Sequence, residues 1–404
     1  MAEWTLQAIV ESGLCSGCGG CVAAVGPETL QMRLDGSGWL RPQALRTLTP
    51  ADQQAVREVC PGIGLRHGDT ASATASYLPV WGPVSRLAAG HAVDPVIRHR
   101  ASSGGVLSAL LIHLLESRQV DFVLHTRVAA DDPLRNDAVL SATREEVALG
   151  AGSRYAPASP VAMLPQALAR PGRFAFVGKP CDVAAVRKII DRQPELSQRI
   201  PYLLSFMCAG TPSMHGTLEV LARLQVPPAE LAEFRYRGDG WPGLTRADTR
   251  DGRVATLDYN TAWGNILNRH LQPRCKLCAD GTGEFADLVC ADAWYGKDGY
   301  PDFAERDGRS LVIVRTAAGQ ALAAGAGKAV SLEDFDAAEL RRIQPYQFSR
   351  KAGMLARLTA MRLFGRRVPR YLGLHLARCA SLQRPWRLLK EFLGTGLRCA
   401  RGRI

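Results

Sequence analysis

Eight of the eleven cysteines in this chain fall into two sets of four, and each set has the spacing of an iron–sulfur cluster site. The first set comprises Cys15, Cys18, Cys21 and Cys60. The second set comprises Cys181, Cys208, Cys275 and Cys278. Because iron–sulfur clusters carry electrons, two of them in one chain indicate an electron-transfer protein.

The first set has the stronger local signal. Three of its cysteines stand three residues apart in the run CSGCGGC, so one tight loop can direct all three thiolates to one cluster. The intervening glycines let the backbone approach closely, and their N–H groups can donate to cluster sulfides. Cys60 belongs to a remote Cys-Pro pair of the kind that accompanies such triplets in bacterial ferredoxins. A zinc site and uncoordinated thiols are the alternatives.

The second set depends on the fold that the sequence predicts. Cys181 and Cys208 each come at the end of a short apolar run that is typical of a buried strand. The C-terminal ends of parallel strands meet at the ligand crevice, so we expect these thiols to converge on the Cys275–Cys278 pair. That pair is also typical of half a zinc ribbon, and Cys290 is close enough in sequence to replace one ligand.

Alternating strand and helix patterns between residues 85 and 220 predict an α/β domain with a mainly parallel sheet. The expected buried strands are 120–128, 173–178 and 202–208, and a later one is 310–316. The expected helices are 106–118, 161–170 and 182–193. The segment 29–42 reads as strand, Gly-containing turn and strand.

We divide the chain into three parts. Residues 1–75 form an N-terminal iron–sulfur module, 85–335 form the catalytic domain, and 350–404 form a basic helical tail. The Ala/Ser/Thr-rich, Pro-punctuated segment 68–83 is typical of a linker between the first two parts.

The net charge of +12 resides in the tail, where residues 351–404 hold 13 Lys and Arg against one acid, Glu391. Leu, Phe and Trp alternate with Arg there at helical spacing, with breaks at Pro369 and Pro385. This pattern favours peripheral contact with an anionic membrane, or an acidic partner, over nucleic acid or a solvated helix face. We find no secretory signal or membrane-spanning apolar stretch, and we interpret the protein as cytoplasmic, with membrane association at the inner face through the tail. Cys379 and Cys399 lack cluster spacing and are interpreted as bystanders.

Five motifs occur in a fixed order along the chain: RASSGGVLSALLIHLLE, GSRYAPASP, VGKPCDVAAVRK, FMCAGTPS and CKLCADGTGEFADLVCADAW. With the N-terminal cysteine module, they resemble the beta-subunit family of coenzyme F-420 (deazaflavin) hydrogenase and dehydrogenase. That family also contains 7-hydroxymethyl chlorophyll a reductase and a ferredoxin-dependent divinyl chlorophyllide 8-vinyl reductase. The resemblance covers about residues 10–320 and does not fix the substrate.

The resemblance implies FAD beside two [4Fe-4S] clusters. It assigns the second cysteine set to a cluster in the catalytic domain and the first set to a ferredoxin-like module. It also assigns nine residues to flavin contact: Ser102, Ser103, Gly104, Gly105, Gly152, Ser153, Arg154, Tyr155 and Lys179.

The residues themselves are compatible with a flavin. ASSGG directly precedes the helix expected at 106–118, so glycines, Ser hydroxyls and the helix N-terminus can together hold a pyrophosphate. The alternative is that Ser102 or Ser103 is an ordinary N-cap. GAGSRY lacks the third glycine of a nicotinamide-binding fingerprint, so we expect electrons to enter from a ferredoxin-like donor. Arg237, Asp239 and Trp241 form a polar-aromatic turn that can line a pocket or be a plain turn.

Three hypotheses follow. The first is an iron–sulfur flavoprotein oxidoreductase that reduces a small-molecule substrate, with catalytic residues not identified. The second is an electron-transfer subunit that hands electrons to a redox partner protein, including in a deazaflavin-reducing complex. The third is a zinc-containing nucleic-acid-binding protein.

Overall fold

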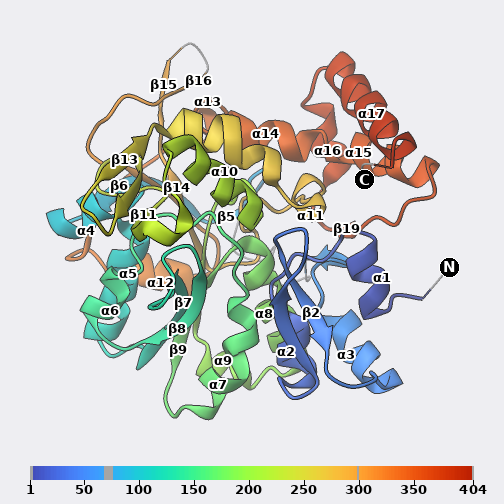
Figure 1. Ribbon diagram of the computed structural model, residues 1–404, viewed down its shortest axis with the longest axis horizontal. Helices are drawn as coiled ribbons and strands as arrows, with labels where there is room; N and C mark the ends of the chain where they lie inside the picture. Colours follow the sequence, from blue (N-terminus) through green and yellow to red (C-terminus); the bar gives the residue numbers. More distant parts are fainter. Residues whose placement is uncertain (1–2, 68–75, 298–299, 403–404) are drawn as a thin grey trace.

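An eight-stranded sheet forms the centre of the protein (Figure 1). The structure is a computed structural model and describes residues 3–67, 76–297 and 300–402. In sheet order the strands are β18 (Val330–Asp334), β6 (Arg86–Ala92), β17 (Ser310–Val314), β14 (Leu288–Asp292), β10 (Tyr202–Phe206), β9 (Phe174–Gly178), β7 (Phe122–Val128) and β8 (Asn136–Ser141).

The middle of this sheet is parallel and its edges are antiparallel. β14, β10, β9 and β7 pair in parallel, whereas β17 runs against both β14 and β6. β6 therefore points the same way as the parallel group, and five of the eight strands share one direction. The predicted mainly parallel α/β sheet is confirmed at this level. The antiparallel edges were not predicted, because an apolar run carries no information about strand direction.

Helices cover both faces of the sheet and give the domain three layers. α5 (Val106–Glu116) and α12 (Ala317–Gly325) pack on one face, with Leu110 and Leu322 in the same core as strand residue Val312. α8 (Pro180–Arg192) packs on the other face, where Val186 joins Phe176. Shorter helices on these layers are α4 (Pro95–Arg100), α6 (Arg144–Ala148), α7 (Leu164–Ala169) and α9 (Leu196–Arg199).

A small antiparallel sheet flanks the large one and has its own core. Its strands are β11 (Leu231–Arg235), β12 (Thr245–Thr249) and β13 (Val254–Leu257). α10 (Met214–Leu224) lies on it, and Leu221, Phe234 and Tyr236 share one hydrophobic cluster. The turns η4 (Asn260–Ile266) and η5 (Leu267–His270) lead from it to α11 (Pro273–Lys276).

The N-terminal module contains the predicted strand–turn–strand unit. Its elements are α1 (Leu6–Glu11), α2 (Gly20–Val25), β1 (Leu30–Leu34), β2 (Leu40–Ala44), α3 (Pro50–Val59) and β3 (Gly64–Arg66). β1 and β2 pair antiparallel, with Leu34 opposite Leu40. A capping box between Thr49 and Asp52 begins α3.

The segment predicted as a linker is folded in its second half. Residues 68–75 lie outside the described residues. β4 (Ser76–Leu78) and β5 (Gly82–Val84) then form an antiparallel pair, and Val80 and Trp81 between them are buried in the main core. The linker prediction is therefore wrong for residues 76–83, because small and Pro residues suit a tight buried turn as well as a free linker.

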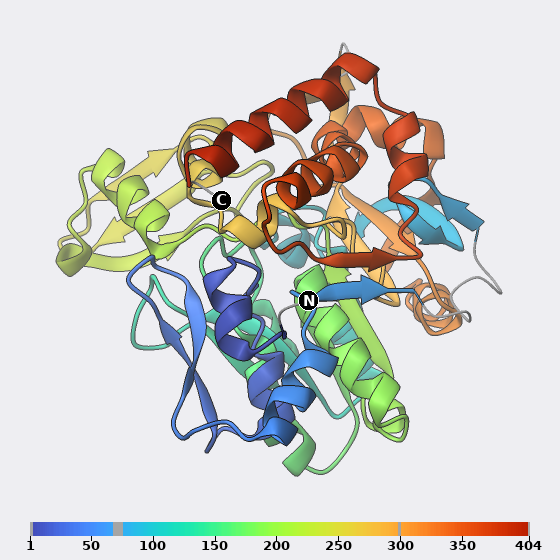
Figure 2. The same ribbon diagram turned by 90° about the vertical axis from the view of Figure 1, so that its right-hand side faces the viewer.

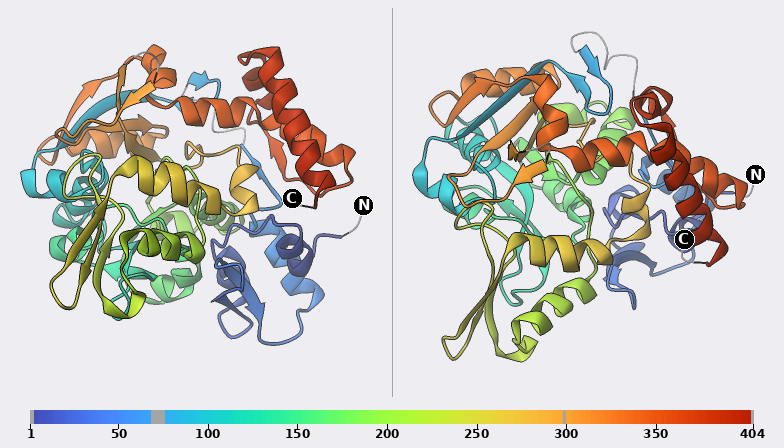
Figure 3. Two further views of the ribbon diagram at one scale, coloured as in Figure 1. Left: turned by 45° about the horizontal axis from the view of Figure 1, so that its top comes forward. Right: turned by 90° about the horizontal axis from the view of Figure 1, so that it is seen from above.

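The C-terminal part is helical and packs against the N-terminal module. Its elements are α13 (Leu340–Ile343), α14 (Pro345–Ala352), α15 (Met354–Leu363), β19 (Arg370–Leu372), α16 (Leu376–Ser381) and α17 (Pro385–Ala400). The short strands β15 (Tyr295–Lys297) and β16 (Tyr300–Asp302) come earlier in the chain, before β17. β19 pairs in parallel with β3, and Met354 and Leu358 share a core with Leu14 and Val56. Figures 2 and 3 show the red helices beside the blue module. Among the described residues, no helix is both long and apolar enough to span a membrane.

Candidate redox site

The first cysteine set lies in the N-terminal module, with Cys15 and Cys18 buried and Cys21 and Cys60 half-buried. Cys15 and Cys18 lie in the loop between α1 and α2, Cys21 is in α2, and Cys60 ends α3. Burial, together with the neighbouring Cys60, raises the pKa of Cys18 to about 12. Burial also raises the pKa of Cys21 well above its usual value, and the other three thiols of the set add to this effect. The four thiols thus lie near one another, two of them buried and two half-buried, an arrangement that would suit a bound cluster.

The second cysteine set forms where the parallel strands end, as the strand pattern predicted. Cys181 follows β9 in the first turn of α8, and Cys208 follows β10. Burial raises the pKa of Cys208 to about 12, with further effects from Cys275 and Cys278. Burial raises the pKa of Cys181 as well, and Cys208 contributes. The N–H of Thr211 donates to the Cys275 Sγ at 3.3 Å, a contact that also stabilises cluster ligands.

Cys290 stands apart from this set. It lies within β14, opposite Phe206 of β10, and burial alone raises its pKa to about 12. The possibility that it replaces a ligand has no support from its surroundings. Cys379 and Cys399 are buried in the C-terminal part.

Within residues 3–67, 76–297 and 300–402, no three His, Cys, Asp or Glu side chains are arranged to hold a single metal ion. A four-iron cluster is larger than one ion, so its thiolates stand further apart than those around zinc.

The two cysteine sets are neighbours. Burial and Asp182 raise the pKa of Cys181 most, Lys179 opposes them, and Cys18 of the first set adds to the rise. α2 packs directly on α8, where a Cβ on Gly20 would lie 3.1 Å from the Cβ of Ala185. The N-terminal module therefore brings its cysteine set against α8, the helix that carries Cys181.

Three cations lie near the second set, with Arg274 and Arg350 buried and Lys179 half-buried. Lys179 donates to Asp182 at 2.7 Å and to the Ala158 carbonyl at 3.1 Å. Arg274 donates to the Pro61 carbonyl at 3.0 Å, and Arg350 of α14 donates to the Cys208 carbonyl at 2.6 Å. Burial alone would lower the pKa of Arg350, but the thiols raise it above its usual value. These cations can balance the negative charge of a thiolate-bound cluster. The sequence analysis names only Lys179 of these three, and it assigns Lys179 to flavin contact.

A cavity of about 620 Å³ opens at the carboxyl ends of β9, β10 and β14. Its volume lies within the range of small-molecule and cofactor sites. Eight of the nine residues that the resemblance assigned to flavin contact line it: Ser102, Ser103, Gly105, Gly152, Ser153, Arg154, Tyr155 and Lys179. Gly104 is not among the lining residues. Cys208 of the second set also lines this cavity, so the second cysteine set and the cavity adjoin.

The N-terminus of α5 opens into the cavity. Gly105 precedes the helix with φ +75°, and no side chain of the described residues caps it. The alternative that Ser102 or Ser103 is the N-cap is therefore wrong. Val106, Leu107 and Ser108 of the first turn line the cavity, and their end of the helix carries partial positive charge. This end can hold a phosphate.

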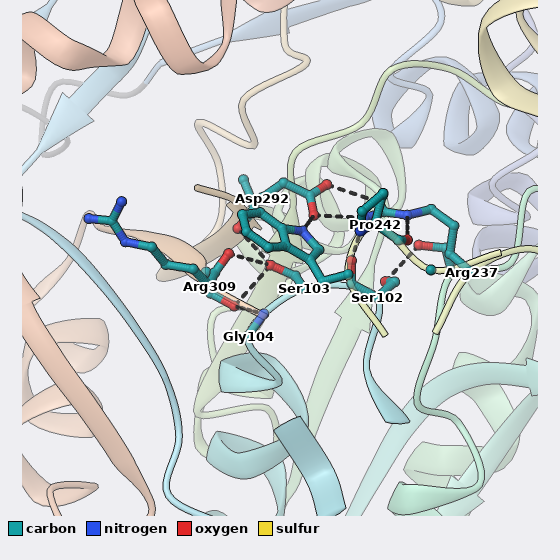
Figure 4. A network of polar contacts seen from close by, with 12 residues as sticks. Ser102, Ser103, Gly104, Arg237, Pro242, Asp292 and Arg309 are labelled. Carbon is teal, nitrogen blue, oxygen red and sulfur yellow. Dashed lines mark hydrogen bonds and ion pairs between the residues drawn. The ribbon is translucent and has the colours of Figure 1, made fainter. Parts of the chain in front are cut away.

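Ser103 and Gly104 shape the loop before α5 (Figure 4). The Ser103 hydroxyl donates to the Arg309 carbonyl at 3.0 Å, and the Gly104 N–H donates to the Ser310 Oγ at 2.9 Å. A Cβ on Gly104 would lie 2.6 Å from the Gly90 carbonyl, so the loop needs glycine there.

Arg237 and Asp292 form a bidentate ion pair in the cavity wall, with both N–O distances at 3.0 Å (Figure 4). Arg237 also donates to the Ser102 carbonyl at 2.6 Å, and Asp292 accepts from the Trp241 indole at 2.7 Å. Burial would lower the pKa of Arg237, but Asp292 raises it well above its usual value. Of the polar-aromatic turn, Arg237 lines the cavity, whereas Asp239 and Trp241 do not.

Two further polar side chains of the cavity wall form hydrogen bonds to other residues of the protein. Arg154 donates to Asn136 at 2.8 Å and to the Phe234 carbonyl at 2.9 Å, which joins the cavity to the small sheet. His125 bonds Ser141 at 2.8 Å, and burial together with Arg127 lowers its pKa to about 4. His125 is therefore neutral at physiological pH.

Two family models match this chain. Residues 87–165 match the N-terminal part, and 172–338 the C-terminal part, of the coenzyme F420 hydrogenase/dehydrogenase beta subunit. The matched region contains most of the residues that line the cavity and the whole second cysteine set, and the first set precedes it.

The names of individual relatives refer to the same coenzyme. The chain is 28% identical to a coenzyme F420 hydrogenase subunit beta of Methanococcus voltae, over 57% of this chain and 76% of that protein. It is 22% identical to a coenzyme F420-dependent sulfite reductase of Methanocaldococcus jannaschii, over 87% of this chain and 52% of that protein. A chain from the F420-reducing [NiFe] hydrogenase complex of Methanosarcina barkeri has a similar fold, with a TM-score of 0.54 and 20% identity, covering 70% of this chain and 96% of that one.

Proposed function

The chain belongs to the coenzyme F420 hydrogenase/dehydrogenase beta-subunit family, and on that basis we propose that it is an iron–sulfur flavoprotein oxidoreductase. It accepts electrons from a ferredoxin-like donor and passes them through two [4Fe-4S] clusters to FAD and on to a substrate. Its relatives are named as F420-dependent hydrogenase, dehydrogenase and sulfite reductase proteins, which supports a redox role.

One observation carries this proposal: Cys208 belongs to the second cysteine set and also lines the cavity. Cys18 and Cys181 connect the two sets on the other side. A continuous series of sites thus runs from the N-terminal module to a cofactor-sized cavity, as stepwise electron transfer requires.

The residues present fit the groups proposed. Each cluster would be held by the four thiols of one set, and the cations Lys179, Arg274 and Arg350 would balance its charge at the second. The uncapped N-terminus of α5 would hold the FAD pyrophosphate. When bound, FAD supplies the coupling between single-electron transfer and two-electron chemistry. Arg237, fixed by Asp292, keeps a permanent positive charge in the cavity wall.

A second candidate is an electron-transfer subunit without a substrate of its own. It is favoured by the relatives that are named as beta subunits and by the similar chain in a [NiFe] hydrogenase complex. In this case the cavity would serve a deazaflavin or a partner's cofactor.

Anaerobic purification with quantitation of iron, sulfide, zinc and flavin tests the proposal. We expect about eight irons and about one FAD per chain, as two four-iron clusters and one flavin require. Zinc without flavin would overturn it and favour a nucleic-acid-binding protein. Affinity purification from native cells separates the two redox candidates, because a subunit would retain a stoichiometric redox partner.

A further inference from the structure

The outer side of α17 carries an apolar stripe that nothing in the described structure covers. Trp386, Leu389, Leu393 and Leu397 are 54%, 57%, 53% and 58% exposed. Their spacing of three and four residues places them on one side of the helix. The opposite side is buried, through Thr395 and Cys399, and Figure 2 shows α17 as the outermost helix of its region.

Basic residues flank this stripe. Arg387, Lys390, Arg398 and Arg401 are exposed and fall on one side of the stripe at helical spacing. Glu391 is the one acid in residues 351–404, and it is already paired with Arg357 at 2.8 Å. The flank therefore keeps its positive charge. We define the stripe and this flank together as the α17 face.

We propose that the α17 face lies on an anionic membrane surface, with its apolar stripe at the boundary of headgroups and acyl chains. A single helix with Trp and Leu on one side and Lys and Arg beside them has the chemistry of an interfacial helix. Trp386 is at the start of the helix, and Trp is enriched at such boundaries.

Charge and shape favour a membrane over other occupants. A second copy of the chain would bring two strongly basic surfaces together, which is unfavourable. The stripe from Trp386 to Leu397 is about 16 Å long at 1.5 Å per residue, short for the core of a stable protein interface. This inference is independent of the redox function proposed above, because it uses no residue of the cavity or the cysteine sets.

Co-sedimentation of the full-length, anaerobically purified protein with vesicles tests the inference. We expect binding to vesicles that contain phosphatidylglycerol, weaker binding as salt rises, and little binding to phosphatidylcholine alone. The double variant Leu389→Glu/Leu393→Glu should bind about 100-fold more weakly, because two exposed leucines lose their apolar burial. Arg387→Gln/Lys390→Gln should lose about 30-fold, from two cations near the surface.

A matched control lies in the β1–β2 hairpin, where Leu34 and Leu45 are 54% and 47% exposed. Leu34→Glu/Leu45→Glu should bind vesicles as the wild type does. Equal loss in this control would overturn the assignment to α17. Failure of the wild type to bind anionic vesicles at low salt would overturn the proposal. Binding to polyglutamate but not to vesicles would also overturn it and assign the α17 face to an acidic protein.

Further measurements detect any variant that fails to fold. Thermal unfolding midpoints and iron content should match the wild type in all variants, since every substituted side chain is exposed. Tryptophan emission should shift to the blue when anionic vesicles are added, and Trp386→Phe should remove that shift. An unchanged shift in Trp386→Phe would overturn the stated orientation of the helix.

Discussion

The first cysteine set takes three of its four thiols from one loop, whereas the second takes its thiols from three separate segments behind β9, β10 and η5. The first set has Arg41 and Lys188 nearby, and the second has Lys179, Arg274 and Arg350. A local loop would need glycines to close on a cluster. A site assembled from distant segments needs the surrounding fold to hold it, and here α14 of the C-terminal part contributes to that.

The largest expected effect comes from removing one ligand. Cys278→Ala should lose the iron of the second site and keep that of the first, so that about half the iron remains. Cys18→Ala should do the reverse. Iron and sulfide quantitation with EPR of the reduced protein measures this. Unchanged iron in Cys278→Ala would show that the second set is not a cluster site.

The next effect tests whether the C-terminal part holds the second site. Lys351 of α14 is buried and ion-paired with Glu284, which follows the Cys275–Cys278 pair and also bonds His67 at 2.9 Å. Burial would raise the pKa of Glu284, but Lys351 and His67 hold it at about 2.

Lys351→Met leaves this carboxylate buried and bonded only to neutral groups and His67. We expect a loss of about 3–5 kcal/mol in the free energy of unfolding, because one partner of a buried ion pair is removed. Denaturant unfolding measures it. The double variant Lys351→Met/Glu284→Gln should recover part of the lost free energy of unfolding. If it recovers none, the loss does not come from the unpaired Glu284 carboxylate.

A third prediction tests the glycine loop of the first set. Gly19 has φ +86°, and a Cβ there would lie 2.6 Å from the Ala162 N. Gly19→Ala should cost about 1–3 kcal/mol and reduce iron at the first site, because the loop must shift away from Ala162. Gly36→Ala is the matched control, since a Cβ there meets nothing within 4 Å. Equal effects in both variants would contradict a local role for Gly19.

The smallest effect concerns reduction potential. Arg350→Gln removes a buried cation near Cys208, Cys275 and Cys278, so the reduced cluster becomes less stable. We expect the potential of the second site to fall by about 50–100 mV and that of the first to stay unchanged. Arg41→Gln, next to Cys15, should lower only the first potential. Redox titration followed by EPR measures both, and equal shifts at the two sites would contradict the separate charge environments.

Much of the fold and the candidate site could be predicted from local patterns. Buried strands ending before Cys181 and Cys208 predicted that these thiols converge, because strand ends share an edge of the sheet. The ASSGG loop and the GSRY turn line one cavity, as expected from the motifs. Arg350 could not be identified this way, because no pattern in the sequence around it relates α14 to the cysteines.

The sequence by itself determined how the cysteines group by spacing, where the main strands and helices lie, and to which family the chain belongs. These depend on spacing, periodicity and residue chemistry, all of which are local. Only the tertiary structure decided that the edges of the sheet are antiparallel, that Cys290 stays outside the second set, and that the basic tail packs on the N-terminal module. Strand direction, the partners of a buried charge and the covered face of a helix depend on packing between distant segments, which local pattern does not encode.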